Sequence, residues 1–146
     1  MQNTLKPVLN EMLVDVFHQI LTIQQNRLKK MGVTLSLSEV HVLEAIEKTP
    51  LPTMSHIAKR LHITVGSLTT AIKRLVKKGF VIREKDIHDK RKVIVKTTAQ
   101  AKDVLTHHEA FHASMIDALI QDLDESSLLA LAESFKKLTT FFKAVA

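Results

Sequence analysis

The chain of 146 residues contains no cysteine and only three glycines, three prolines and six phenylalanines. Without cysteine, neither a disulfide framework nor a thiolate metal site can form. No apolar run approaches the roughly 20 residues of a membrane-spanning helix, and no N-terminal stretch resembles a secretory signal. We therefore expect a cytoplasmic protein without a membrane partner. The scarcity of glycine and proline, beside abundant leucine, alanine, lysine and glutamate, favours a mainly helical chain that forms one domain.

Positive charge is concentrated in the middle of the chain. Residues 54–96 hold 12 Lys and Arg against 3 Asp and Glu, a net charge of +9. The remaining residues hold 9 Lys and Arg against 12 Asp and Glu, a net charge of −3. A concentrated basic region is typical of proteins that bind phosphate groups. The alternative is a solvated helix face with scattered lysines.

Apolar periodicity and capping residues predict a series of helices. Ser36 and Glu39 form a capping box, and Thr53, Thr64, Thr98 and Asp124 stand at the other N-cap positions. Gly32 and Gly79 follow lysine pairs and are expected to end two helices. The fourth helix is expected to direct Leu68, Ile72, Leu75 and Val76 inward. The predicted helices cover about 5–30, 37–48, 54–61, 65–78, 99–121 and 125–142.

Two runs of strand-forming residues, 80–85 and 93–97, flank a charged segment and predict a β-hairpin. The short helices just before them are joined by a turn at 62–64 and form a helix-turn-helix unit. The hairpin would then be a wing. The sequence therefore predicts a mainly α fold with a small β-wing: a winged helix-turn-helix lobe over about 36–98, flanked by helical regions at about 1–35 and 99–146.

The predicted helix at 65–78 has an aliphatic face and a polar face. Small hydroxyls near its start can approach base edges, Gly66 leaves room for close approach, and the lysines can reach phosphates. Arg91 at the wing tip suits a narrow minor groove, and Asp89 would hold its guanidinium in position. The alternatives are an ordinary surface helix and a solvated charged loop. The residues predicted to form the DNA interface are Ser55, Thr64, Gly66, Ser67, Thr69, Thr70, Lys73, Arg74, Lys77, Lys85, Asp89, Lys90, Arg91 and Lys92.

Two segments resemble the MarR family of transcriptional regulators. The wing segment DKRKVIVKTT matches the family's Asp-x-Arg motif and the spacing to a following Leu-Thr pair through Asp89, Arg91, Val95 and Thr98, although Thr97 replaces the usual leucine. The segment VGSLTTAIKRLVKKGF at 65–80 is similar to the family's recognition helix. The resemblance implies a homodimer that binds a pseudo-palindrome in double-stranded DNA as a regulator, expected to be a repressor. Apolar residues in the outer helices, among them Phe111, Met115, Phe135, Phe141 and Phe142, agree with a dimer.

Two effectors remain open, and no cofactor is expected to be required. The stretches HHEAFHASM (107–115) and ITVGSLTT (63–70) resemble the fatty-acid-synthesis repressor branch of the family, which implies control by a long-chain acyl group on acyl carrier protein. An apolar pocket for that chain is expected at Val16, Phe17, Ile20 and Phe111. The alternative is a zinc-responsive repressor with ligands His41, His108 and His112, the last two being i, i+4 on one helix. That branch also uses an acidic ligand from the first helix, where this chain has Gln24 and Gln25.

Other classes of function find less support in the sequence. There is no glycine-rich phosphate loop or nucleophile elbow, so we do not expect an enzyme. A basic helical interaction module remains as a third class. Salt dependence separates it from a DNA-binding protein, since the affinity of a protein that neutralises several phosphates falls steeply with salt.

Overall fold

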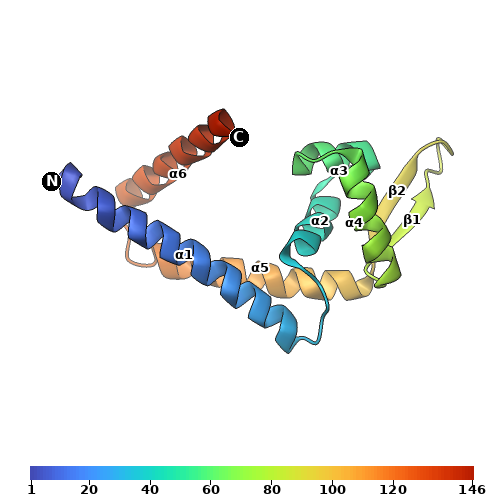
Figure 1. Cartoon of the computed structure of the whole chain (residues 1–146), viewed down its shortest axis with the longest axis horizontal. Helices are drawn as coiled ribbons and strands as arrows, with labels where there is room; N and C mark the ends of the chain where they lie inside the picture. Colours follow the sequence, from blue (N-terminus) through green and yellow to red (C-terminus); the bar gives the residue numbers. More distant parts are fainter. The chain divides into compact units, whose positions relative to one another are not determined.

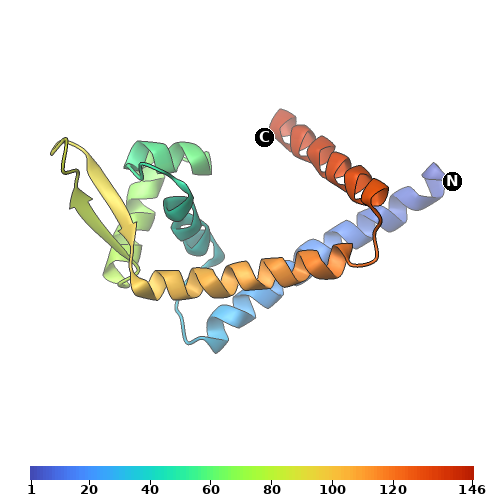
Figure 2. The same cartoon turned by 180° about the vertical axis from the view of Figure 1, so that it is seen from behind.

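A computed structural model describes all 146 residues and shows six helices and one two-stranded sheet (Figures 1 and 2). The mainly α, winged helix-turn-helix fold is therefore confirmed. No helix is both long enough and apolar enough to cross a membrane. The elements are α1 (Gln2–Lys30), α2 (Leu37–Lys48), α3 (Met54–Leu61), α4 (Val65–Lys77), β1 (Val81–Lys85), β2 (Val93–Thr97), α5 (Ala99–Ile120) and α6 (Glu125–Val145).

The chain divides into two compact units, Met1–His108 and Glu109–Ala146. Unit 1 contains α1 to α4, the hairpin and the first part of α5, so the lobe predicted for 36–98 lies wholly within it. Unit 2 contains the rest of α5 and α6. None of the residues 109–146 is buried.

The core of unit 1 joins four helices to the hairpin. Side chains from α2, α3 and α4 meet those of both strands and of α5, and all are at most 2% exposed. Val76 is the exception to the predicted pattern on α4, since it is 40% exposed. It lies on the flank of the helix, whereas Leu68, Ile72 and Leu75 occupy the centre of the buried face. The largest fully buried residues are Leu43, Ile57, Leu68, Ile72, Leu75, Val40, Val81, Val95 and Val104.

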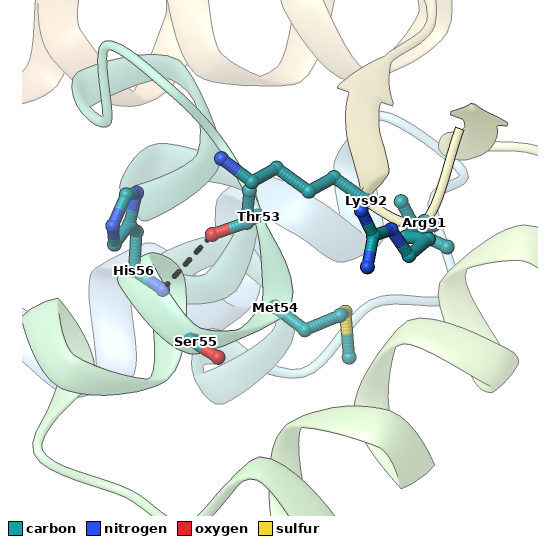
Figure 3. Close-up of a pocket in the computed structure, with 7 residues that line it drawn as sticks. Thr53, Met54, Ser55, His56, Arg91 and Lys92 are labelled. Atoms are coloured by element: carbon teal, nitrogen blue, oxygen red, sulfur yellow. Dashed lines mark hydrogen bonds between the residues drawn. The ribbon is translucent and has the colours of Figure 1, made fainter. Parts of the chain in front are cut away.

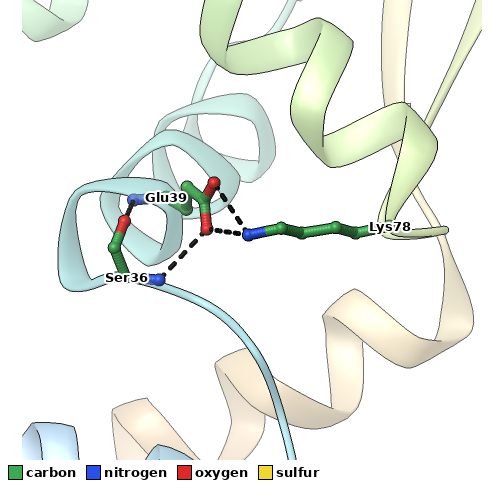
Figure 4. A network of polar contacts seen from close by, with 3 residues as sticks. All are labelled: Ser36, Glu39 and Lys78. Atoms are coloured by element: carbon green, nitrogen blue, oxygen red, sulfur yellow. Dashed lines mark hydrogen bonds and ion pairs between the residues drawn. The ribbon is translucent and has the colours of Figure 1, made fainter.

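The predicted caps set the helix boundaries. The Ser36–Glu39 capping box is present, with Ser36 Oγ accepting from the Glu39 N–H at 3.2 Å and Glu39 Oε2 accepting from the Ser36 N–H at 3.0 Å. Glu39 also accepts from Lys78 Nζ at 2.9 Å, which ties α2 to the end of α4 (Figure 4). Most boundaries lie within one residue of those predicted. The two larger differences are that α1 starts at Gln2, with Pro7 inside it, and that α6 continues to Val145.

The hairpin is the predicted wing, with β1 and β2 antiparallel and Val81 opposite Thr97. Two contacts that the sequence analysis did not predict anchor it to the segment before α3. Thr53 forms a bridge with Ile94, and the Val95 N–H donates to the Pro52 carbonyl at 3.0 Å. The wing therefore lies against the start of α3, and this arrangement positions the candidate site.

Candidate nucleic-acid interface

The turn between α3 and α4 sets the angle of the helix-turn-helix. His62 adopts the left-handed conformation with φ of 55°, and the Ile63 N–H donates to the Ala58 carbonyl at 3.1 Å. Thr64 Oγ1 then accepts from the Ser67 N–H at 3.1 Å and caps α4. These bonds satisfy one carbonyl near the end of α3 and one N–H at the start of α4 without extra residues. The first residues of α4 are exposed to solvent.

The polar face of α4 is exposed as predicted, but its hydroxyl groups are already engaged. Ser67 Oγ accepts from Thr64 Oγ1, Thr69 Oγ1 donates to the Val65 carbonyl at 2.8 Å, and Thr70 Oγ1 to the Gly66 carbonyl at 3.3 Å. The O–H of Ser67 can still donate to a base edge, whereas Thr69 and Thr70 offer their methyl groups and oxygen lone pairs. A Cβ at Gly66 would find no atom nearer than 3.9 Å, so this position leaves open space.

The lysines and the arginine of α4 lie on different sides of the helix. At 100° per residue, Lys73 and Lys77 point away from the buried stripe with Thr70 and Gly66. Arg74 lies about as far from the buried stripe as Lys73 does, but on the opposite side of the helix, where it lines a cavity with Glu39 and Lys78. Lys73 and Lys77 lie outside that cavity and are the α4 cations placed to contact a duplex that approaches the polar face. The DNA-contact role predicted for Arg74 stays a prediction.

The wing tip is held by backbone hydrogen bonds and by Asp89. The Asp89 Oδ1 atom accepts from the Arg91 N–H at 3.1 Å and lies 3.6 Å from Arg91 Nε. The Lys92 N–H donates to the Asp89 carbonyl at 2.9 Å, and the Asp86 N–H to the Lys92 carbonyl at 3.0 Å. The Arg91 side chain itself is 95% exposed. Asp89 thus restrains the base of the arginine and leaves its guanidinium facing solvent.

A cavity of about 450 Å³ lies between the start of α3 and the wing (Figure 3). Thr53 Oγ1 caps the third N–H of α3, at His56, so the N–H groups of Met54 and Ser55 have no helical acceptor. Free N–H groups at a helix start and cations opposite them together suit a phosphate. The cavity is lined by Thr53, Met54, Ser55, His56, Arg91, Lys92 and Val93.

Sequence reasoning predicted Ser55, Arg91 and Lys92 for this interface but missed Thr53, Met54 and His56. The cap at Thr53 marked the helix start, which is the signal that could have identified its neighbours. Their proximity to the wing depends on the Thr53–Ile94 bridge, which no local pattern reveals. The exposed residues Lys85 and Lys90 lie outside the cavity.

A second group of polar side chains combines α2 with α5. One ligand atom each from His41, Glu44 and His108 lies within 4.8 Å of the other two. Glu44 is 3.5 Å from His108 Nε2 and 2.6 Å from Lys48 Nζ. Burial raises the pKa of Glu44, but its hydrogen bond to Lys48 and the nearby cations outweigh this and lower the pKa below 4.5. Sequence reasoning missed Glu44, although its i, i+3 spacing from His41 places both on one face of α2. His112 belongs to unit 2, where its ring packs against Phe111.

The residues expected to line an acyl pocket are distributed over both units. Val16 and Phe17 are 52% and 63% exposed, and Ile20 is half-buried, all in unit 1. Phe111 is half-buried in unit 2. The predicted pocket stays a prediction.

Comparison with known proteins identifies the winged region. Residues 35–93 match the model of the MarR family. This segment is therefore similar to the MarR family. The MarR-family segment covers α2 to the start of β2, and so contains the helix-turn-helix and the wing tip. The resemblance found in the sequence is therefore confirmed on the residues that carry the candidate interface.

The individual relatives are regulators of transcription. The transcriptional regulator AdcR of Streptococcus pneumoniae serotype 2 is 33% identical over 76 residues, which are 52% of this chain and 51% of AdcR. The HTH-type transcriptional repressor YetL of Bacillus subtilis is 28% identical over 91 residues, 60% of this chain and 54% of YetL. This chain thus spans about half the length of these curated relatives.

A crystal structure of Streptococcus pneumoniae FabT in complex with DNA extends the likeness beyond the MarR-family segment. It superposes with a TM-score of 0.84 at 26% identity and covers 96% of this chain and 99% of the FabT chain. AdcR is a transcriptional regulator, YetL is a transcriptional repressor and FabT is bound to DNA, in agreement with the expectation that this protein is not an enzyme.

Proposed function

We propose that this protein is a sequence-specific, double-stranded DNA-binding regulator of transcription, acting as a homodimeric repressor on a pseudo-palindromic operator. The observation that supports it best is that three exposed features suited to contact with DNA lie in one unit. These are the polar face of α4, the wing tip at Arg91 and the cavity between the wing and α3. The likeness to DNA-bound FabT supports the same function.

The polar face of α4 and the wing tip suit different grooves of a duplex. The start of α4 has small side chains and open space at Gly66, which suits base edges in the major groove. Lys73 and Lys77 extend from the same face toward phosphates. Arg91 projects from the wing with its guanidinium in solvent, as an arginine must to enter a narrow minor groove.

Homodimerisation is supported by apolar side chains left uncovered within the single chain. Leu9 and Phe17 on α1 are 61% and 63% exposed, and Phe135, Phe141 and Phe142 on α6 are 50% to 57% exposed. Unit 2 has no buried residue, so by itself it lacks the buried apolar surface that must offset the entropy of ordering its helices. A second copy that covers these faces stabilises both units. Two-fold symmetry would place two recognition helices about 34 Å apart, one turn of DNA.

The test is fluorescence anisotropy of the purified protein on DNA from its own promoter region and on a scrambled duplex of equal length, with mass measured by light scattering. We expect a dimer that prefers the promoter and loses affinity steeply with added salt. A monomer, or equal affinity for both duplexes at every salt concentration, would refute the proposed function.

We further propose that a long-chain acyl group on acyl carrier protein controls DNA binding. The support is the resemblance of residues 63–70 and 107–115 to the fatty-acid-synthesis repressor branch, with the apolar residues expected to take the chain. The same assay is run with acylated and with unacylated carrier protein. A change in operator affinity with the acylated form alone supports this effector, and identical curves with both forms refute it.

A second candidate effector is zinc, favoured by the His41–Glu44–His108 group. Two imidazole nitrogens and one carboxylate oxygen are the donors that Zn²⁺ takes, so the residues fit the ion. Calorimetric titration with Zn²⁺ should show saturable binding that His108→Ala abolishes. His107→Ala, at an exposed neighbour outside the group, is the matched control. Absence of saturable binding in the wild type refutes this candidate.

A further inference from the structure

Besides the candidate interface, unit 1 contains a larger cavity bordered by three helix ends. It measures about 840 Å³ and lies among the end of α1, the loop 32–36 and the end of α4. Its lining carries an excess of positive charge. It contains three cationic side chains, Lys29, Arg74 and Lys78, and one carboxylate, that of Glu39. Val33 and Leu35 add apolar surface to the same wall.

Glu39 can neutralise only one of these three cations. Its two oxygens lie 3.1 and 2.9 Å from Lys78 Nζ, and Oε2 also accepts from the Ser36 N–H (Figure 4). The Glu39 side chain is 10% exposed, so little of it remains for another partner. Burial raises its pKa, but the bonds from Lys78 and Ser36 and the charge of Arg74 outweigh this and lower it. Lys29 and Arg74 have no carboxylate within ion-pair distance.

Cations near the C-terminal end of a helix often do no more than offset the helix dipole, so the charge of the helix ends has to be compared with the side-chain charge of the cavity. Each helix end contributes about half an elementary charge. The C-terminal ends of α1 and α4 are negative and the N-terminal end of α2 is positive, which leaves roughly half a negative charge. The excess of side-chain charge is about four times larger. The cavity therefore stays positive after the dipoles are counted.

We propose that this cavity binds a small organic phosphate monoester. A monoester is a dianion near neutral pH, and its several oxygens can meet donors from Lys29, Arg74 and Lys78 at once. The guanidinium of Arg74 offers two parallel donors, and the ammonium groups add point charges. Val33 and Leu35 would contact the organic part, which distinguishes a monoester from free phosphate.

A ligand bound in this cavity would affect the contact that holds α4 against α2. A dianion competes with Glu39 for Lys78, the residue that caps the end of the recognition helix. It would therefore weaken the Glu39–Lys78 ion pair that joins α2 to α4, and so change how firmly α4 is held when it contacts a DNA groove. This link to DNA rests on the proposed function, whereas the binding site does not.

The test is calorimetric titration of the full-length protein, in phosphate-free buffer without DNA, with phenyl phosphate and with inorganic phosphate as probes. We expect saturable binding of phenyl phosphate, at least several-fold tighter than that of inorganic phosphate. Arg74→Gln and Lys29→Gln should each weaken it several-fold. Lys30→Gln removes the same charge one residue along α1, outside the lining, and should leave it unchanged.

Glu39→Gln is the sharpest variant, because glutamine keeps the N-terminal capping interaction and removes the competing charge. Binding of phenyl phosphate should become tighter. No saturable binding, or an equal loss in Lys30→Gln and Arg74→Gln, overturns the site. Equal affinity for both probes overturns the organic part of the ligand. Operator binding is measured separately without phosphate, so failure here leaves the proposed function intact.

Discussion

Arg91→Ala is the change that best tests how the wing acts. The Arg91 side chain is 95% exposed, and its pairing with Asp89 is a surface contact at 3.6 Å. Such pairs contribute little to folding, so the free energy of unfolding should not change measurably. If the guanidinium enters the minor groove, loss of its contact should cost about 1–3 kcal/mol of binding. The dissociation constant for the operator should then rise roughly 5- to 150-fold.

The assay is fluorescence anisotropy on operator duplexes with either A·T or G·C pairs at the wing position. The loss should be larger on A·T pairs, since a narrow minor groove attracts arginine. Asp89→Asn keeps an oxygen for the Arg91 N–H but removes the charge that restrains the guanidinium. Asp89→Asn should raise the dissociation constant for the operator roughly 2- to 10-fold, the range expected for ordering one side chain. Lys137→Ala removes an equal charge from α6 as the control.

Two results would refute this reasoning. One is an unchanged operator affinity in Arg91→Ala with normal folding. The other is an equal loss in Lys137→Ala, which would reduce the role of Arg91 to net charge alone.

Three further predictions concern α4 and the core. Lys73→Glu should weaken binding to all duplexes and reduce the salt dependence, and an effect on the operator alone would favour base contact instead. Ile72→Ala, at a fully buried site, should lower the free energy of unfolding by about 2–5 kcal/mol in urea titrations at fixed protein concentration; a loss under 1 kcal/mol would contradict that packing. Because the pKa of Glu39 is lowered from 4.5 in the folded state, its contribution is present above pH 4.5 and lost as the pH falls through the folded value. Unfolding curves of the wild type should therefore approach those of Glu39→Gln in acid, and parallel pH profiles would contradict this.

Most of the fold was predictable because its signals are local. The caps at Ser36, Thr53 and Thr64 each bind an N–H three residues further on, and apolar spacing marks the buried stripe of each helix. The turn at His62 and the wing strands followed from the same short windows. Val76 was misplaced because periodicity alone does not say how wide the buried face is.

The candidate site was predictable only in part. Exposed polar residues on α4 and at the wing tip could be found from their types and positions. The involvement of Thr53, Met54 and His56 could not be predicted, because it depends on the bridge that Thr53 forms with Ile94, 41 positions later. Glu44 joined the histidine group for the same reason, since His108 reaches it from another helix.

The sequence by itself determined the helices, the wing and the concentration of basic charge, because each depends on neighbours within a few residues. Only the tertiary structure decided which charges meet. Glu39 looked like a capping residue in the sequence, yet it also pairs with Lys78, 39 positions away, and leaves Lys29 and Arg74 around an open cavity. Coulomb energy depends on distance in space and on burial, and neither is set by spacing along the chain.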